Sequence, residues 1–329
     1  MLSEQQADQW TARADFDAFL GPGEYRYFSQ GYRRVSHLLG PVACEIRGDQ
    51  TVLTGSAAVA YPSDWSHRGS VERAPHLSTL DAMVLAARLC EVYLAEGLGL
   101  GPEAVTRAWV ARMSVRAGAH PGESLARIAV SATGSPATAG SPAVSRLDAR
   151  IGPLSVAMLV HHEVPPASRR TVPREVRAPA TWGPHTGLFK ATALRSQVVS
   201  LDAGEAGLTC RHEVLPASGV RATGLAAAYW PQVALADCLV LGGQMAQVLV
   251  QAVRGLDRDQ AGDLWMRRVT FETTDPRRPP GRREPSVAHV IGQRAVATRA
   301  GVLHGFEAVC PDLCGVTMAA SVAYLEAAR

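Results

Sequence analysis

Two stretches of this chain repeat each other, LDAMVLAARLCEVYLAEGLGL at 80–100 and ADCLVLGGQMAQVLVQAVRGL at 236–256. A shift of 156 positions aligns them, and the alignment continues without a gap from AWVARMSV (108–115) to LWMRRVTF (264–271). Two copies of one structural unit in a single chain are the simplest explanation of such a repeat.

Each copy predicts two strands, or a strand and a loop, followed by one long apolar helix and then three strands. We expect the helices at 80–98 and 236–254, and the last strands of the second copy at 265–273, 286–300 and 315–325. A helix that is apolar on nearly all sides has to be surrounded by other structure. One antiparallel sheet wrapped around one helix is the hotdog fold, so the repeat predicts an α+β double hotdog with a pseudo-two-fold axis.

The length and the connecting segment predict the domain organisation. The chain has 329 residues, of which 47 % are hydrophobic, which is enough for two ordinary domains. Between the copies, VPPASRRTVPREVRAPATWGP at 164–184 is rich in proline and has no periodicity, as is typical of an extended linker. We therefore expect an N-terminal segment plus first hotdog at 1–165, a linker at 166–190 and a second hotdog at 191–329.

Charge and composition narrow the class of protein. The net charge of +3 is small and no basic run is interleaved with aromatic residues, so we expect no nucleic-acid partner. The N-terminus is acidic and polar, unlike a signal peptide, and Arg88, Glu91 and Glu96 interrupt the best apolar run. These features predict no membrane span and a cytoplasmic monomer or homodimer. The six cysteines are scattered without histidine ligands nearby, so we expect no metal and no cofactor.

The basic residues are almost all arginine. Lys190 is the single lysine of the chain, beside 32 arginines, a bias that is typical of GC-rich codon usage rather than of a function. Its chemical consequence is that a Schiff base on a lysine could form only at Lys190.

Asp81 and Asp237 occupy equivalent positions at the starts of the two predicted helices. An aspartate there is most often a helix cap, since its carboxylate accepts bonds from free backbone N–H groups. A buried carboxylate is otherwise expensive unless it is paired. Its recurrence in both copies makes a catalytic role for at least one of the two a competing interpretation.

The residues around these aspartates carry a resemblance. PHLSTLDAMVL and YWPQVALADCLVL are similar to the aspartate motif of polyketide-type dehydratase domains, and WSHRGSVERAP (65–75) resembles their histidine segment, although its spacing is one residue shorter and its glycine is displaced. The resemblance implies a catalytic histidine at His67 and a carboxylate from the opposite half at Asp237. His76, five residues before Asp81, is an alternative proton carrier.

The N-terminal segment FLGPGEYRYFSQGYRRVSHLL (19–39) is dense in tyrosine and arginine. This segment, the length and the paired halves resemble the avirulence protein D (AvrD) family over the whole chain. The resemblance implies an enzyme that joins a β-ketoacyl chain to a ketopentose and promotes its cyclisation to a syringolide-type lactone. The A-factor synthase family, also hotdog proteins, uses a similar logic with a three-carbon phosphate and leads to butenolides.

The expected partners are a β-ketoacyl thioester, carried by CoA or by an acyl carrier protein, and a sugar-like polyol or ketose. In this chemistry a general base deprotonates a hydroxyl of the acceptor for attack on the thioester carbonyl. We expect Tyr32, Arg33, Arg34 and Gln244 to bind substrate, the arginines through a phosphate or the phosphopantetheine of the carrier and Gln244 through an acyl carbonyl. Two other classes remain open: a dehydratase or thioesterase acting on acyl thioesters, and a non-catalytic acyl-binding protein.

Overall fold

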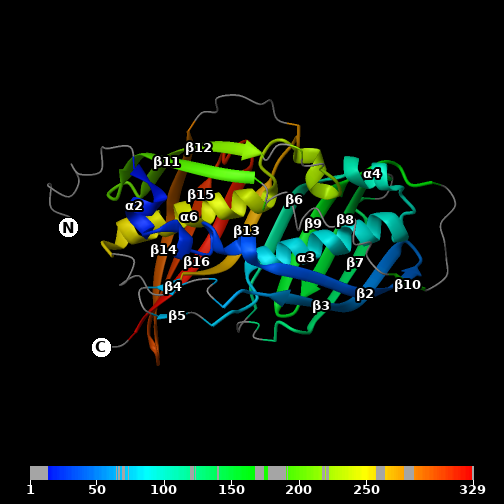
Figure 1. Ribbon diagram of the computed structural model, residues 1–329, viewed down its shortest axis with the longest axis horizontal. Helices are drawn as coiled ribbons and strands as arrows, with labels where there is room; N and C mark the ends of the chain where they lie inside the picture. The colour runs from blue at the N-terminus through cyan, green and yellow to red at the C-terminus, as the bar shows by residue number, and fades with distance from the viewer. Residues whose placement is uncertain are drawn as a thin grey trace.

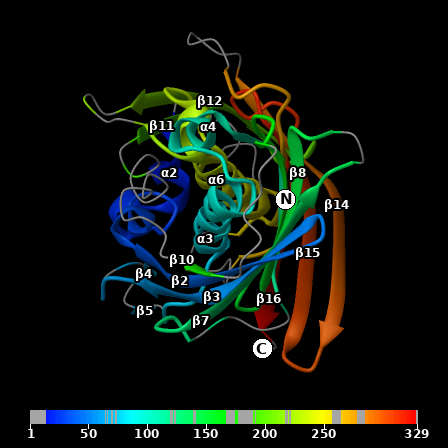
Figure 2. The ribbon, with the colours of Figure 1, turned by 90° about the vertical axis from the view of Figure 1, so that its right-hand side faces the viewer.

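A single curved antiparallel sheet wraps around two helices (Figures 1 and 2). The computed structural model describes residues 14–63, 65, 67–68, 71–72, 74–118, 122, 124–138, 141–166, 174–176, 190, 192–216, 219, 222–256, 264–277 and 285–327. The predicted α+β double hotdog is confirmed, since each helix lies against the sheet strands of its own copy.

The elements fall into two sets, one for each copy of the repeat. The first half consists of β2(Ser36–Arg47), β3(Gln50–Ala60), β4(His67–Arg68), β5(Val71–Glu72), α3(Thr79–Val92), η4(Tyr93–Gly97), α4(Pro102–Arg107), β6(Trp109–Arg116), β7(Ile128–Pro136), β8(Val144–Ile151) and β9(Leu154–His161). The second half consists of β11(Thr192–Asp202), β12(Gly207–Pro216), η6(Leu225–Tyr229), α6(Leu235–Arg254), β13(Trp265–Glu272), β14(Ser286–Thr298), β15(Gly301–Cys310) and β16(Thr317–Ala327). Outside these sets lie β1(Ala14–Asp15), α2(Phe16–Leu20), η2(Gly23–Tyr25), η3(Gly31–Arg34) and β10(Arg174–Val176).

The strand order makes the duplication visible. The first half runs β2-β3-β7-β8-β9-β6 and the second β11-β12-β14-β15-β16-β13, and β6 pairs with β13 to join them into one 14-stranded sheet. At this join Ser114 pairs with Thr270, and their hydroxyls lie 3.2 Å apart. These two residues are 156 positions apart, the same shift that aligns the repeat, so the pseudo-two-fold axis passes through this pair.

The two central helices start near each other at the middle of the molecule and run outward in opposite directions (Figure 1). Both are almost entirely buried, as their apolar sequences require. Within the described parts of the chain, α6 alone is long and apolar enough to cross a membrane, but 72 % of its most apolar window is buried inside the fold. Its apolar surface is therefore used by the core.

Two details differ from the sequence predictions. Each copy was expected to have three strands after its helix, whereas each has four, β6 to β9 in the first half and β13 to β16 in the second. In the second copy the unpredicted strand is β15, which follows β14 after a turn at 299–300. The first helix was expected to reach residue 98, but its α-helical part ends at Val92 and continues as one wider π turn, η4.

The N-terminal segment begins on the second half and crosses to the first. β1 pairs with β11, and α2 packs against α6. Further along, a Cβ on Gly243 of α6 would lie 3.0 Å from the Phe28 ring, so this glycine permits the close approach of the segment. The chain then enters β2. The short β10 pairs with β2 at the opposite edge of the sheet. Most of the predicted linker at 166–190 lies outside the described residues, and the domain boundaries stay predictions.

Candidate functional site

Asp81 lies in the first turn of α3 with its side chain fully buried. It closes a capping box with Ser78: the Ser78 backbone N–H donates to Asp81 Oδ2 at 2.8 Å, and the Asp81 N–H donates to Ser78 Oγ at 3.1 Å. The Ser78 hydroxyl also donates to Oδ2 at 2.7 Å. The aspartate is therefore a helix cap, as the sequence suggested, but these bonds engage mainly one of its two oxygens.

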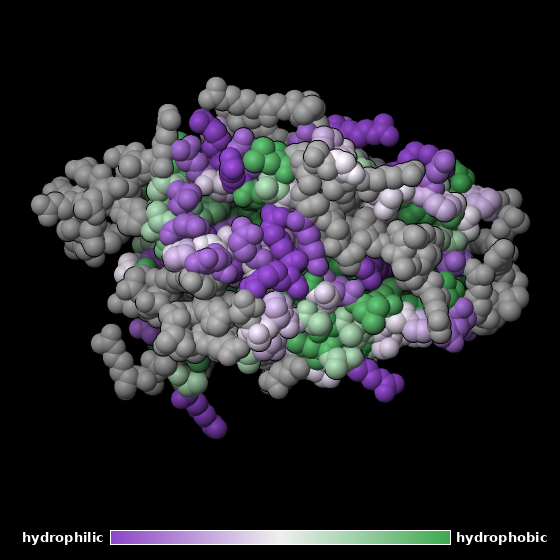
Figure 3. Space-filling model, in the orientation of Figure 1, coloured by the Kyte–Doolittle hydropathy of each residue, from purple (hydrophilic) through white to green (hydrophobic). Residues whose placement is uncertain are grey.

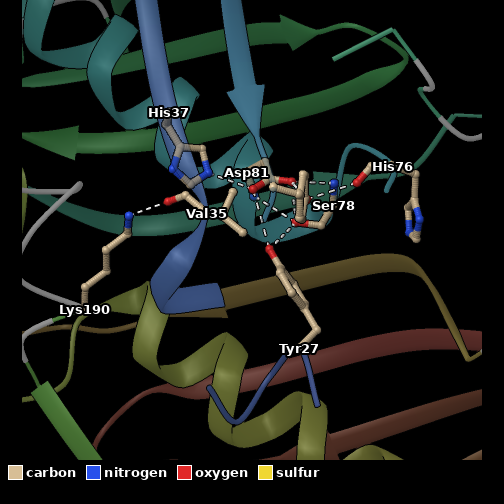
Figure 4. A network of polar contacts seen from close by, with 8 residues as sticks. Tyr27, Val35, His37, His76, Ser78, Asp81 and Lys190 are labelled. Atoms are coloured by element: carbon tan, nitrogen blue, oxygen red, sulfur yellow. Dashed lines mark hydrogen bonds and ion pairs between the residues drawn. The ribbon is translucent and has the colours of Figure 1, made fainter. Parts of the chain in front are cut away.

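The other oxygen of Asp81 is paired with a histidine that the sequence did not single out. His37 Nε2, on the inward face of β2, lies 2.7 Å from Asp81 Oδ1, and both side chains are at most 1 % exposed (Figure 4). Because an ionised carboxylate can only accept, Nε2 carries the hydrogen of this bond. In the neutral ring the lone pair is then on Nδ1, which is buried and has no hydrogen-bond partner among the residues that the structure describes.

Two tyrosines complete the cluster around Asp81. The Tyr61 hydroxyl donates to Oδ2, and the Tyr27 hydroxyl lies 2.8 Å from Ser78 Oγ and 3.5 Å from Oδ1. Both rings pack edge-on against Trp65, with ring centroids 5.4 Å apart for Tyr27 and 4.8 Å apart for Tyr61. The apolar rings exclude water from the carboxylate while their hydroxyls solvate it.

Burial and hydrogen bonding change the pKa of Asp81 in opposite directions. Burial by itself raises the pKa of Asp81, but the bonds from His37, Tyr61 and Ser78 outweigh it, so the pKa lies below its ordinary value. Burial and the nearby Asp81 charge raise the pKa of Tyr27 well above that of a free tyrosine. Burial likewise raises the pKa of Tyr61. At neutral pH the site is therefore an ionised carboxylate surrounded by neutral phenols.

The site around Asp237 in the second half differs from the Asp81 site in its cap residue and in the neighbouring strand. Asp237 caps α6 by accepting from the Ala234 backbone N–H at 2.8 Å, but Ala234 stands where the first half has Ser78. In β11, Ala193 and Leu194 occupy the region that corresponds to His37. The second carboxylate therefore lacks the serine and the histidine that surround the first.

The predicted substrate-binding residues mostly hold the N-terminal segment in place. Gln244 Oε1 accepts from Arg26 at 2.8 Å, and both side chains are buried. Tyr32 is buried near Asp237, and burial, the largest cause, raises its pKa. Arg33 donates to the carbonyl oxygens of Lys190 and Thr192 at 2.6 Å and 2.5 Å.

Arg34 is exposed at the end of η3. The face of the molecule shown in Figure 3 has a hydrophilic centre. Substrate binding by Tyr32, Arg33, Arg34 and Gln244 stays a prediction.

The two predicted histidines lie on the segment before α3. His76 is partly buried, with its ring edge-on to Trp65 at 6.1 Å between centroids, and its backbone carbonyl accepts from Tyr61 at 3.0 Å. His67 lies in β4, where it pairs with Glu72, but its side chain is outside the described part of the structure. The predicted pairing of either histidine with Asp237 stays a prediction.

His37, Tyr27, Tyr61 and Lys190 are the neighbours of Asp81 that sequence reasoning missed as site residues. The signal for His37 was its inward position in an alternating strand, since a histidine among inward apolar residues needs a buried partner. Among the residues that the structure describes, no group of three or more His, Cys, Asp or Glu side chains could hold a metal ion.

The fold and this site define a double-hotdog protein in which Asp81 and Asp237 cap the two central helices with different neighbours. The sequence model of the family described as Pseudomonas avirulence D protein (AvrD) matches residues 12–325, so the chain belongs to the AvrD family. No curated protein matches the chain.

Several solved structures resemble the chain in architecture. A TesB protein from Mycobacterium avium subspecies paratuberculosis is 14 % identical, with 86 % of this chain and 95 % of that one covered and a TM-score of 0.38. A hot dog fold protein from Alicyclobacillus acidocaldarius is 11 % identical, with coverages of 87 % and 96 % and a TM-score of 0.39. The dehydratase domain of the polyketide PpsC from Mycobacterium tuberculosis is 10 % identical, with coverages of 87 % and 96 % and a TM-score of 0.33.

Proposed function

We propose that this protein is a biosynthetic acyltransferase that joins a β-ketoacyl thioester to a sugar-like polyol or ketose and promotes cyclisation to a syringolide or butenolide-type lactone. The observation that carries the proposal is the buried His37–Asp81 pair, with Nε2 held by the carboxylate and Nδ1 buried without a partner in the described part of the chain. An unpartnered buried nitrogen costs free energy, which a bound substrate hydroxyl would relieve.

In this reaction His37 Nδ1 takes the proton of the acceptor hydroxyl as its oxygen attacks the thioester carbonyl. The carbon–sulfur bond then breaks, the thiol leaves with a proton, and an ester remains. Asp81 is a positioning residue, because it fixes the ring tautomer and stabilises the imidazolium that forms transiently. CoA or an acyl carrier protein would deliver the thioester.

The geometry favours acyl transfer over the dehydratase alternative. A dehydratase needs a base and a separate acid, whereas Asp81 is bonded directly to His37 and its pKa is lowered. An ionised carboxylate of low pKa is a poor proton donor but a good orienting group. Thioester hydrolysis uses the same base with water in place of the acceptor, so it is one outcome of the test below.

The test uses a medium-chain β-ketoacyl-CoA with dihydroxyacetone or xylulose as acceptor, following thiol release and the ester by mass spectrometry. We expect His37→Gln to lower turnover by roughly 10²–10⁴-fold, the usual contribution of a general base. His304→Gln is the matched control, because His304 also pairs with a carboxylate, Glu326, at 2.8 Å, but on β15 of the second half.

Ester formation that His37→Gln abolishes and His304→Gln preserves would support the proposal. Thiol release without any ester would identify a thioesterase. An acyl chain that binds without any turnover would identify the non-catalytic alternative.

A further inference from the structure

The end of the linker brings the single lysine of the chain to the Asp81 cluster. Lys190 Nζ donates to the carbonyl oxygen of Val35, two residues before His37 (Figure 4). In the same view, one ring nitrogen of His37 points to Asp81 and the other to the side on which Lys190 lies. Arg33 holds the Lys190 backbone carbonyl at 2.6 Å, so the lysine is positioned by its main chain and by its side chain.

The surroundings of this amine favour its neutral form. Lys190 is half-buried, and burial, the largest cause, together with the positive charge of Arg88 lowers its pKa, while the Asp81 carboxylate acts in the opposite direction. Arg88 lies on α3, and its Nε is buried with no hydrogen-bond partner from the described residues. A lysine that is desolvated beside another cation is the usual way for a protein to prepare an amine nucleophile. An arginine could donate to the same carbonyl, but it stays protonated and forms no imine.

We propose that Lys190 is a catalytic residue that forms an imine with the ketone of the acceptor and so promotes ring closure. This inference rests on the proposed function, because it assigns the second step to the same site. It also specifies the acceptor as a molecule with a free ketone, rather than as a polyol in general.

Ring closure through the imine forms one carbon–carbon double bond and releases one water. The neutral amine of Lys190 adds to the ketone carbon, and one proton from solvent expels the hydroxyl as water, which leaves an iminium ion; His37 later returns one proton to solvent, so the protons balance. His37 Nδ1 removes a proton from the acidic carbon between the two carbonyls of the β-ketoacyl ester, and that carbon attacks the iminium carbon to form a carbon–carbon bond. Removal of the second proton from the same carbon expels the amine, which regains a proton, and leaves a carbon–carbon double bond in the ring. The net change is loss of one water, without an oxidant or reductant.

The test is borohydride trapping with dihydroxyacetone as the probe and no acyl donor, read by intact mass and peptide mapping. We expect one reduced adduct on the wild-type protein, located at Lys190, and none at this position in Lys190→Arg. Lys190→Arg, Arg195→Lys is the control for ordinary reactivity, since residue 195 is an exposed position on β11, and we expect no adduct there. With the acyl donor present, Lys190→Arg should form the open ester but lose ring closure.

The pH profile of trapping tests the environment of the amine. The charged groups facing Lys190 are Arg88 and Asp81 on α3 and Arg33 on η3. Arg88→Gln gives α3 the same residue type that α6 has at the equivalent position, Gln244. This substitution removes the positive charge that favours the neutral amine. We therefore expect its trapping profile to shift to higher pH.

No wild-type adduct at Lys190, a wild-type profile retained in Arg88→Gln, or normal ring closure by Lys190→Arg would each overturn the imine proposal. These outcomes are distinct from failure of the proposed function, because ester formation is measured separately and trapping needs no thioester.

Discussion

Replacing Asp81 or Asp237 by asparagine should affect the stability and the activity of the protein to different extents. In Asp81→Asn the carboxylate that accepts from His37, Tyr61 and two donors of Ser78 becomes an amide with one acceptor oxygen. Two buried donors then lose their acceptor, at about 1–3 kcal/mol each, so we expect a loss of roughly 2–6 kcal/mol in the free energy of unfolding. Asp237→Asn should cost at most about 1 kcal/mol, because asparagine caps a helix nearly as well as aspartate.

The assay is urea unfolding of both variants beside the wild-type protein, followed by ester formation at a temperature where all three are folded. The amide in Asp81→Asn no longer holds the His37 tautomer, so we expect turnover to fall by roughly 10²–10⁴-fold, while Asp237→Asn stays close to the wild type. Equal losses of stability in the two variants would refute the difference described between the sites. A normal rate with a reduced stability in Asp81→Asn would leave this aspartate as a structural cap.

Three further predictions use the same measurements. Ser78→Ala should cost roughly 0.5–2 kcal/mol of unfolding free energy, because it reduces the first capping box to the form that the second half already has, and no loss would contradict the described bonds. Gly134→Ala should cost roughly 1–3 kcal/mol, since its Cβ would lie 2.3 Å from the buried Tyr93 ring, whereas Gly101→Ala, with open space around the Cβ, should be nearly neutral. The lowered pKa of Asp81 stabilises the folded protein at pH values above the unfolded-state pKa of about 3.9, and this stabilisation is lost as pH falls through the folded-state pKa. The difference in unfolding free energy between the wild type and Asp81→Asn should therefore shrink in acid.

The architecture was predictable because the sequence contains two copies of the same pattern. A gap-free repeat located both central helices, and their apolar sequences required an enclosing sheet. The predicted strand at 286–300 ended within two residues of the end of β14, but β15 at 301–310 was missed, because the two-residue turn that joins the two strands is a weak signal.

Of the residues that form the site, the sequence singled out Asp81 but not its hydrogen-bond partners on other elements. Asp81 could be singled out because Asp237 repeats it, which is a comparison along the sequence. His37 is 44 positions away on a different element, and its pairing with Asp81 depends on how β2 is placed over the start of α3. Tyr27 and Tyr61 reach the same carboxylate from two further segments. Periodicity reports which face of an element is buried, but it does not report which buried residues meet.

The crossing of the N-terminal segment also sets an order of events during synthesis. Residues 14–34 are synthesised before both hotdog halves, yet Arg26 and Phe28 pack against Gln244 and Gly243 of α6, which are made more than two hundred residues later. At the usual translation rate of about 5–20 residues per second, the segment waits roughly 10–40 s for these contacts. During that interval the apolar side chains of the segment have no α6 to cover them. The nascent first half is therefore expected to be a substrate for chaperones until the second helix has been made.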